Sequence, residues 1–191
     1  MRITGGQLRS RKLLSIKSDK LRPATDRLRE TMFNILSNTM ELENAYALDL
    51  YAGTGSVGFE ALSRGAAKVV FVEADSKIAD VLRANAVALD VTDRCDIRTM
   101  KVEKYLRDCS MSLQSDAGKF DMIYVDPPYA INDTTQRVVE GIMARGIISE
   151  SGIICIEHSK GYSPPPRMLL RQKIFGSTIL SLLKPEKKCQ N

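Results

Sequence analysis

The sequence predicts an α/β fold in which helices cover both faces of a doubly wound, mostly parallel sheet. Apolar stretches with the length of buried strands alternate with helical segments along most of the chain. Strict alternation of this kind is typical of parallel sheets. A glycine-rich turn also joins the first such strand to the next helix, as in nucleotide-binding βαβ units. The 191 residues are enough for one ordinary domain with its own core.

The elements are predicted in a regular order. A first helix begins at Thr25 or Asp26, because Leu28, Met32 and Leu36 then fall on one face. Strands are expected at 45–50, 68–73, 95–100, 120–125 and 152–157, and helices at 56–64, 76–89, 102–110 and 133–144. A closing hairpin is expected over 167–175 and 178–184. We divide the chain into an N-terminal extension over 1–40, a main domain over 41–185 and a polar tail over 186–191.

Positive charge is concentrated at the start of the chain. Residues 1–29 hold nine Lys and Arg against two Asp, whereas the whole chain holds 28 basic and 23 acidic residues. Apolar residues interleave with these charges around Gly5 and Gly6, which favours a short β-hairpin that faces RNA or DNA over a solvated tail. The basic residues expected to contact nucleic acid are Arg2, Arg9, Arg11, Lys12, Arg22 and Arg27.

The turn after the strand 45–50 contains Gly53, Gly55 and Gly58 in the pattern G-x-G-x-x-G. The first two glycines allow a sharp turn and close approach to a ligand, and the third allows tight packing between helix and strand. Glu73 ends the next strand, where a carboxylate can accept hydrogen bonds from ribose hydroxyls. The alternative is a purely structural turn. The strand, the three glycines and Glu73 together favour a turn that binds a nucleotide-like cofactor over a purely structural turn.

A second motif, Asp126-Pro127-Pro128-Tyr129, follows the apolar strand 120–125. Ligands of open α/β sheets bind beyond the carboxyl ends of the strands, where this motif and the glycine turn should both emerge. The prolines remove two backbone donors, so nearby carbonyls can accept hydrogen bonds from a ligand. A carboxylate and a carbonyl together can orient an exocyclic amino group, and a tyrosine ring can stack on the base that carries it.

Other features restrict the function. The cysteines stand far apart without a C-x-x-C pair, which indicates neither a zinc site nor a disulfide framework; they are Cys95, Cys109, Cys155 and Cys189. No apolar stretch approaches the ~20 residues of a membrane span, and the start has no signal-peptide core, so we expect a cytoplasmic protein. We assign no catalytic role to His158, which follows the buried-looking strand 152–157, or to Glu157, which ends that strand and is a candidate for the rim of the pocket.

With these motifs, the chain resembles the RsmD family, which methylates the N2 amino group of one guanine in bacterial 16S ribosomal RNA. The resemblance rests on three separated segments besides the Asp-Pro-Pro-Tyr motif and Glu73, namely residues 2–13, 21–34 and 49–66. It implies a Rossmann-like, seven-stranded S-adenosylmethionine-dependent methyltransferase with a β-hairpin and helix extension. The implied partner is 16S rRNA within the 30S subunit or its assembly intermediate, bound by a monomer.

The resemblance also implies which residues act, with no metal among the ligands. The cofactor would be held by Asp49, Ala52, Gly53, Thr54, Gly55, Gly58, Glu73 and Thr25. The target guanine would be held by Asp126, Pro127, Pro128 and Tyr129. Two departures stand out. Ser10 replaces a usual glycine between two arginines, and Lys101 stands where an acidic or amide residue commonly meets adenine, with Glu103 as an out-of-register substitute.

Three other functions compete with this interpretation. A DNA adenine-N6 methyltransferase also uses Asp-Pro-Pro-Tyr, but such enzymes generally carry a separate recognition region. A nicotinamide dehydrogenase would explain the glycine turn and Glu73, but neither Asp126 nor the basic start of the chain. A noncatalytic RNA-binding assembly factor would keep the fold without the reaction. The intact Asp126, Tyr129 and glycine turn argue against that alternative.

Overall fold

The computed structural model describes residues 1–15, 26–109, 119–128 and 132–186. Its strands are β1 (Tyr46–Leu50), β2 (Lys68–Glu73), β3 (Cys95–Thr99), β4 (Phe120–Val125), β5 (Ile148–His158), β6 (Leu169–Phe175) and β7 (Thr178–Leu183). Its helices are α1 (Asp26–Ser37), α2 (Ser56–Ser63), α3 (Ser76–Leu89), α4 (Val102–Cys109) and α5 (Asn132–Arg145), with a 3₁₀ turn at Thr92–Arg94. None of these helices is long and apolar enough to cross a membrane.

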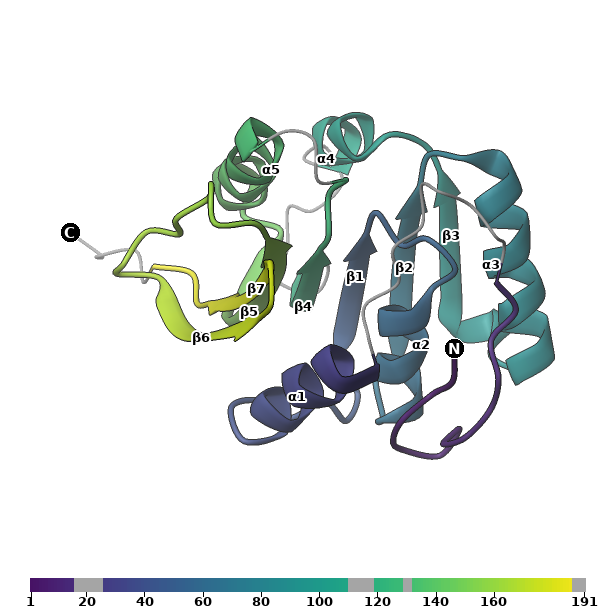
Figure 1. Ribbon diagram of the computed structural model, residues 1–191. Helices are drawn as coiled ribbons and strands as arrows, with labels where there is room; N and C mark the ends of the chain where they lie inside the picture. Colours follow the sequence, from purple (N-terminus) through teal and green to yellow (C-terminus); the bar gives the residue numbers. More distant parts are fainter. Residues whose placement is uncertain (16–25, 110–118, 129–131, 187–191) are drawn as a thin grey trace.

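The strands form one seven-stranded sheet in the order β3-β2-β1-β4-β5-β7-β6 (Figure 1). Neighbours from β3 through β5 pair in parallel, and β7 runs antiparallel between β5 and β6. The chain order reverses between β1 and β4. The carboxyl ends of these two strands therefore flank the crevice where ligands of such sheets bind. The predicted doubly wound α/β fold and its closing hairpin are confirmed.

Two apolar cores lie on opposite faces of the sheet. Alternate strand residues such as Ala47 and Tyr124 pack with α1, α2, α3 and the N-terminal segment, whereas Leu48 and Ile123 pack with α4 and α5. This division follows from the period of two in a strand. Helix α2 is buried along its full length, since the N-terminal segment and neighbouring helices cover it (Figure 1).

Strand β5 begins four residues earlier than predicted, at Ile148. The polar residues 149–151 have the composition of a turn, which hid this part of the strand. Ile148 nevertheless pairs with Phe120, and an irregularity in the register between Phe120 and Met122 accommodates the extra residues of β5. A β-bulge of this kind does not leave a clear hydrophobic pattern in the sequence.

The N-terminal segment, residues 1–15, folds back on itself as a short hairpin, in which the Ile3 N–H donates to the Arg11 carbonyl at 3.0 Å and the Leu13 N–H donates to the Met1 carbonyl at 3.1 Å. A single antiparallel bridge joins Arg2 and Lys12. The intervening backbone instead bonds to α2: the Thr4 N–H donates to Glu60, and the Gln7 and Leu8 N–H groups donate to Ser63. These bonds to α2 satisfy backbone donors at the tip of the hairpin, so the pairing between its two arms stays short.

Candidate functional site

The glycine turn between β1 and α2 has the backbone that its sequence predicts. Gly53 and Gly55 have φ angles of 56° and 86°, in the left-handed region that favours glycine. A Cβ atom on Gly55 would lie 2.2 Å from the Leu82 Cδ1 atom of α3 and 2.5 Å from the Phe59 ring. Any side chain at position 55 would therefore strain the backbone and displace the side chains of Leu82 and Phe59.

The third glycine brings the helix against the sheet. A Cβ atom on Gly58 would lie 2.1 Å from the Phe71 Cε1 atom of β2. The Gly58 N–H donates to the Asp49 Oδ2 atom at 2.9 Å, so a carboxylate from β1 caps the first turn of α2. The packing role predicted for this glycine is confirmed.

Asp49 is the most unusual ionisable residue of the site. Its side chain is 2% exposed, and its Oδ1 atom has no hydrogen-bond partner among the described residues. Burial raises the pKa of Asp49 to about 8, the Gly58 N–H lowers it, and the charge of Glu73 raises it again. A buried carboxylate with an unsatisfied oxygen is suited to a cationic ligand group, which would supply both a donor and a compensating charge.

Glu73 lies beside the same turn. Its Oε2 atom accepts from the Gly53 N–H and its Oε1 atom from the Asp75 N–H, both at 2.9 Å. A carboxylate can accept about four hydrogen bonds, so these two leave capacity for hydroxyl groups of a ligand. The structure thus brings together Asp49, Glu73 and the glycine turn, including the buried Ala52 and Thr54.

The Asp-Pro-Pro motif begins at the carboxyl end of β4. Asp126 is half-buried, Pro127 is buried and Pro128 is exposed. Because Asp49 pairs with Tyr124 across β1 and β4, the motif starts next to the strand end that carries the glycine turn. Tyr129, Thr25 and Arg22, which the sequence also predicts as site residues, lie outside the described residues.

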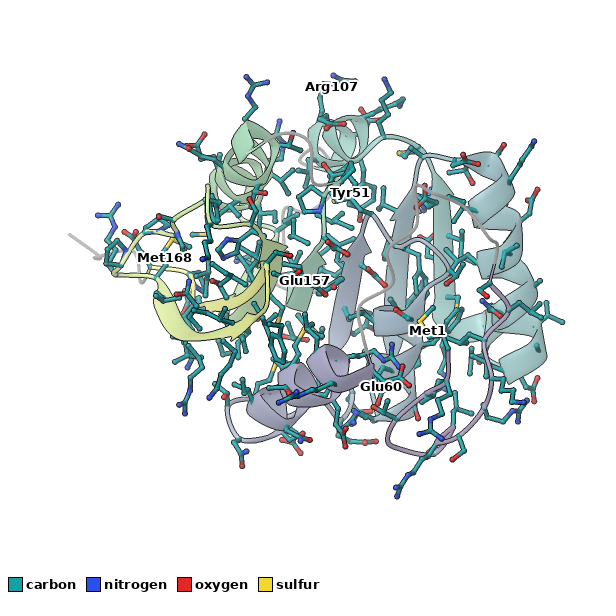
Figure 2. The ribbon with its side chains drawn as sticks, viewed as in Figure 1. Met1, Tyr51, Glu60, Arg107, Glu157 and Met168 are labelled. Carbon is teal, nitrogen blue, oxygen red and sulfur yellow. The ribbon has the colours of Figure 1, made fainter. Side chains whose placement is uncertain are left out.

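One buried pair at this edge was not predicted from the sequence. The Tyr124 hydroxyl of β4 donates a hydrogen bond to the Glu157 Oε1 atom of β5. Burial raises the pKa of Tyr124 well above its usual value, and the charges of Glu157, Asp126 and Asp49 raise it further. Tyr124 therefore stays a protonated donor among three carboxyl groups. Figure 2 shows Glu157 toward the middle of the molecule.

Two further polar residues organise the surroundings of the site. Asn85 of α3 donates to the Thr54 carbonyl at 3.0 Å and makes two hydrogen bonds with the Leu14 backbone. Glu60 of α2 is fully buried and accepts from Thr4, Arg29 and Arg64. A polar residue on the buried face of a predicted helix is the sequence signal that could have flagged both.

His158 has the structural role that its position at a strand end suggests. It lies on the opposite face of the sheet from Glu157, where its Nε2 atom is 2.8 Å from the Ser181 Oγ atom and its ring contacts Tyr162 edge-on. Burial lowers the pKa of His158. A neutral imidazole facing away from Asp126 is unsuited to act on a ligand held there.

The region expected to meet adenine contains Tyr51 and Glu103. Tyr51 adopts a φ angle of 62° in the glycine turn, and its hydroxyl is buried without a partner in the described part of the chain. Burial and then the charge of Glu103 raise its pKa. Lys101 is exposed just before α4. The structure thus brings Glu103 near Tyr51 of the glycine turn.

The predicted RNA-binding residues that the structure describes are all exposed: Arg2, Arg9, Arg11, Lys12 and Arg27. Arg2 forms an ion pair with Asp26 at 3.8 Å, and Arg11 donates to the Ala88 carbonyl near the end of α3. The bend of the N-terminal segment lies against Ser63, where α2 ends. Arg11 therefore lies near the end of α3, whereas Arg2 and Arg27 lie at the start of α1.

Comparison with known proteins gives three consistent matches. Residues 1–184 match the family model described as conserved hypothetical protein 95. The chain is 32% identical over 179 residues to the ribosomal RNA small subunit methyltransferase D of Haemophilus influenzae, covering 92% of this chain and 89% of that protein. The solved structure of the yhhF protein from Escherichia coli matches with a TM-score of 0.82 and 30% identity, covering 98% of this chain and 99% of that one.

The fold extends to more distant proteins. An RNA methyltransferase from Salinibacter ruber, solved in complex with S-adenosyl-L-homocysteine, matches with a TM-score of 0.62 and 16% identity. The match covers 89% of this chain and 98% of that one. At this identity the likeness concerns the architecture alone.

Proposed function

We propose that this chain, which belongs to the RsmD family, transfers a methyl group from S-adenosylmethionine to the N2 amino group of a guanine in 16S ribosomal RNA. The relative from Haemophilus influenzae is named as a small-subunit rRNA methyltransferase, and the sheet order is that of the Rossmann-like methyltransferase fold. One observation carries the proposal: the glycine turn with Asp49 and Glu73 beside it, and the Asp126 motif, lie at the carboxyl ends of neighbouring strands.

The glycine turn and its two carboxylates would hold S-adenosylmethionine. The unpartnered Asp49 Oδ1 atom fits the α-ammonium group, and Glu73 fits the ribose hydroxyls. Ala52, Gly53, Thr54, Gly55 and Gly58 would surround the methionine portion, and we assign Thr25 to the same pocket by family likeness. When bound, this cofactor supplies a methyl group already activated by its sulfonium. The protein therefore contributes mainly position and exclusion of water.

The Asp126 motif would hold the target amino group. The Asp126 carboxylate and the Pro127 carbonyl would accept its two hydrogens, with Pro128 stiffening the turn and Tyr129 stacking on the ring. In this arrangement Asp126 would orient the lone pair of the amino nitrogen toward the methyl group that the cofactor supplies, and Asp126 would accept the amino proton that leaves as the nitrogen–carbon bond forms. Extruding the base costs a few kcal/mol, which stacking would partly offset.

The exposed cations of the N-terminal segment would bind the RNA backbone, together with Arg22 and Arg27. Contacts of this kind add affinity without reading sequence. We also propose that the protein acts as a monomer in the cytoplasm, and that its substrate is the 30S subunit or an assembly intermediate of that subunit.

The direct test is methyl transfer from labelled S-adenosylmethionine to 30S subunits from cells that lack this protein, with DNA as a parallel substrate. We expect N2-methylguanosine in 16S RNA. N6-methyladenine in DNA would instead identify the alternative methyltransferase. Tight binding of cofactor and RNA without transfer would indicate an assembly factor.

Asp126→Ala separates chemistry from cofactor binding. We expect loss of at least about two orders of magnitude in kcat, with affinity for S-adenosylhomocysteine kept within a few-fold, since Asp126 would touch the base rather than the cofactor. Asp80→Ala, which removes an exposed carboxylate of α3, is the matched control. Full activity of Asp126→Ala would remove the proposed role.

A further inference from the structure

We infer that Glu157 accepts a hydrogen bond from N1–H of the target guanine, beside Asp126, and so selects guanine over bases that lack this proton. The inference rests on the proposed function and deepens it, because it assigns base selection to a residue outside the Asp-Pro-Pro-Tyr motif.

The sheet register places the two carboxylates side by side. Val125 of β4 pairs with Ile156 of β5, so the next residues, Asp126 and Glu157, are level with each other. Tyr124 and Cys155 pair one step earlier and share the core of one sheet face. Because side chains alternate along a strand, Glu157 of β5 continues on that same face. The charges of Glu157 and Asp126 both act on the Tyr124 hydroxyl, so the Asp126 carboxyl also lies near it. Parallel neighbours lie about 4.8 Å apart, which suits two adjacent donors on one ligand.

Glu157 is held in place before any ligand arrives. Its side chain is 5% exposed, and the Tyr124 hydroxyl donates to it from the neighbouring strand. A carboxylate can accept about four hydrogen bonds, so the bond from Tyr124 does not by itself prevent Glu157 from accepting another from a ligand. A nearly buried carboxylate oriented by a tyrosine at a strand end is a preorganised acceptor rather than a solvated surface charge.

An independent feature indicates that this edge receives a ligand. Asp49, which pairs with Tyr124 on the adjacent strand, is 2% exposed and has an unpartnered Oδ1 atom. Buried polar atoms without partners are rare in folded proteins, so a donor from outside the described residues is expected nearby. The carboxyl groups of Asp49, Asp126 and Glu157 would then bracket the cofactor amine and the base edge.

The chemistry of the two purines explains the selection. Guanine presents two adjacent donors, N1–H and the N2 amino group, and a pair of acceptors matches both. Adenine presents an unprotonated N1 beside its amino group. A carboxylate facing that lone pair would be left without a donor, which costs binding. Sites built to hydrogen-bond a donor reject analogues without it far more strongly than apolar pockets reject size changes.

The test compares guanine with 2-aminopurine at the target position of the same RNA, because 2-aminopurine keeps the amino group and lacks the N1 proton. We expect the wild-type protein to prefer guanine by about 10²-fold in kcat/KM. In Glu157→Gln the side-chain amide can accept from N1–H or donate to a bare N1. Its preference should therefore fall to within about 5-fold, with S-adenosylhomocysteine affinity unchanged.

Tyr124→Phe is the second variant, because it removes the donor that orients Glu157 while leaving the carboxylate. Its guanine preference should fall at least about 5-fold, even if Glu157→Gln does not fold. Unchanged preference in either folded variant, with wild-type methylation of guanine intact, would overturn the inference and leave the proposed function standing. Absence of guanine methylation by the wild-type protein would overturn both.

Discussion

At the scale of single residues, Asp49 links the protonation state of the protein to its cofactor. Its carboxyl caps the first turn of α2, and burial raises the pKa of Asp49 to about 8. In the folded protein this pKa is raised above the unfolded value, so the folded state holds a proton that the unfolded chain has lost. The free energy of unfolding should therefore fall as pH rises from about 4 to about 8.

A cationic ligand group beside Asp49 should lower this pKa and release the proton. We predict that binding of S-adenosylhomocysteine at pH 7 releases about one proton. The affinity for S-adenosylhomocysteine should rise with pH up to about 8. Calorimetry in buffers of different ionisation enthalpy measures the released proton directly.

Asp49→Asn should abolish the released proton and weaken binding. Asp90→Asn is the control, because it removes an exposed carboxyl at a left-handed position that asparagine also tolerates. Equal proton release by wild type and Asp49→Asn would show that another group titrates on binding.

At the scale of elements, the buried Glu60 of α2 binds both the N-terminal segment and α1 through hydrogen bonds and ion pairs (Figure 2). Its carboxylate accepts from the Thr4 N–H and hydroxyl at 2.8 Å, from Arg64 at 2.9 Å and from Arg29 at 3.4 Å. Arg29 is itself fully buried, and its Nη1 atom has no partner among the described residues. The segment is therefore a docked part of the fold rather than a free arm.

Glu60→Gln should be strongly destabilising. The substitution leaves the Arg29 charge buried with only the partly exposed Asp26 opposite, and breaking a buried pair in this way costs about 3–5 kcal/mol. Urea denaturation measures the loss, and trypsin should cut earlier at Arg9, Arg11 and Lys12. Glu30→Gln, on the exposed face of α1, should change stability by less than about 0.5 kcal/mol. A similarly small effect of Glu60→Gln would contradict the anchoring role.

At the scale of the whole molecule, the basic bend of the N-terminal segment and the glycine turn lie at opposite ends of α2. Eight residues of helix separate them by about 12 Å. The segment then returns to the turn, because Leu14 bonds to Asn85 and Asn85 bonds to Thr54. An RNA that contacts both regions must therefore extend beyond the single target nucleotide.

The double substitution Arg9→Ala and Lys12→Ala should weaken RNA binding and reduce its salt dependence. If each residue neutralises one phosphate, the slope of log K against log salt should become shallower by about 0.7–0.9 per residue. Filter binding at several salt concentrations measures the slope, and S-adenosylhomocysteine affinity should not change. Lys173→Ala, on the edge strand β6 at the other end of the sheet, is the control. A slope equal to wild type would exclude these two residues from the RNA contact.

The sequence by itself determined the order of strands and helices, the glycine turn and the position of the Asp126 motif. These depend on local periodicity and backbone preference, which neighbouring residues encode. Only the tertiary structure decided that β5 begins at Ile148, that the N-terminal segment bonds to α2, and that Glu157 meets Tyr124. Those contacts join residues 28 to 56 positions apart. Sheet register and side-chain burial set them, and no local pattern carries that information.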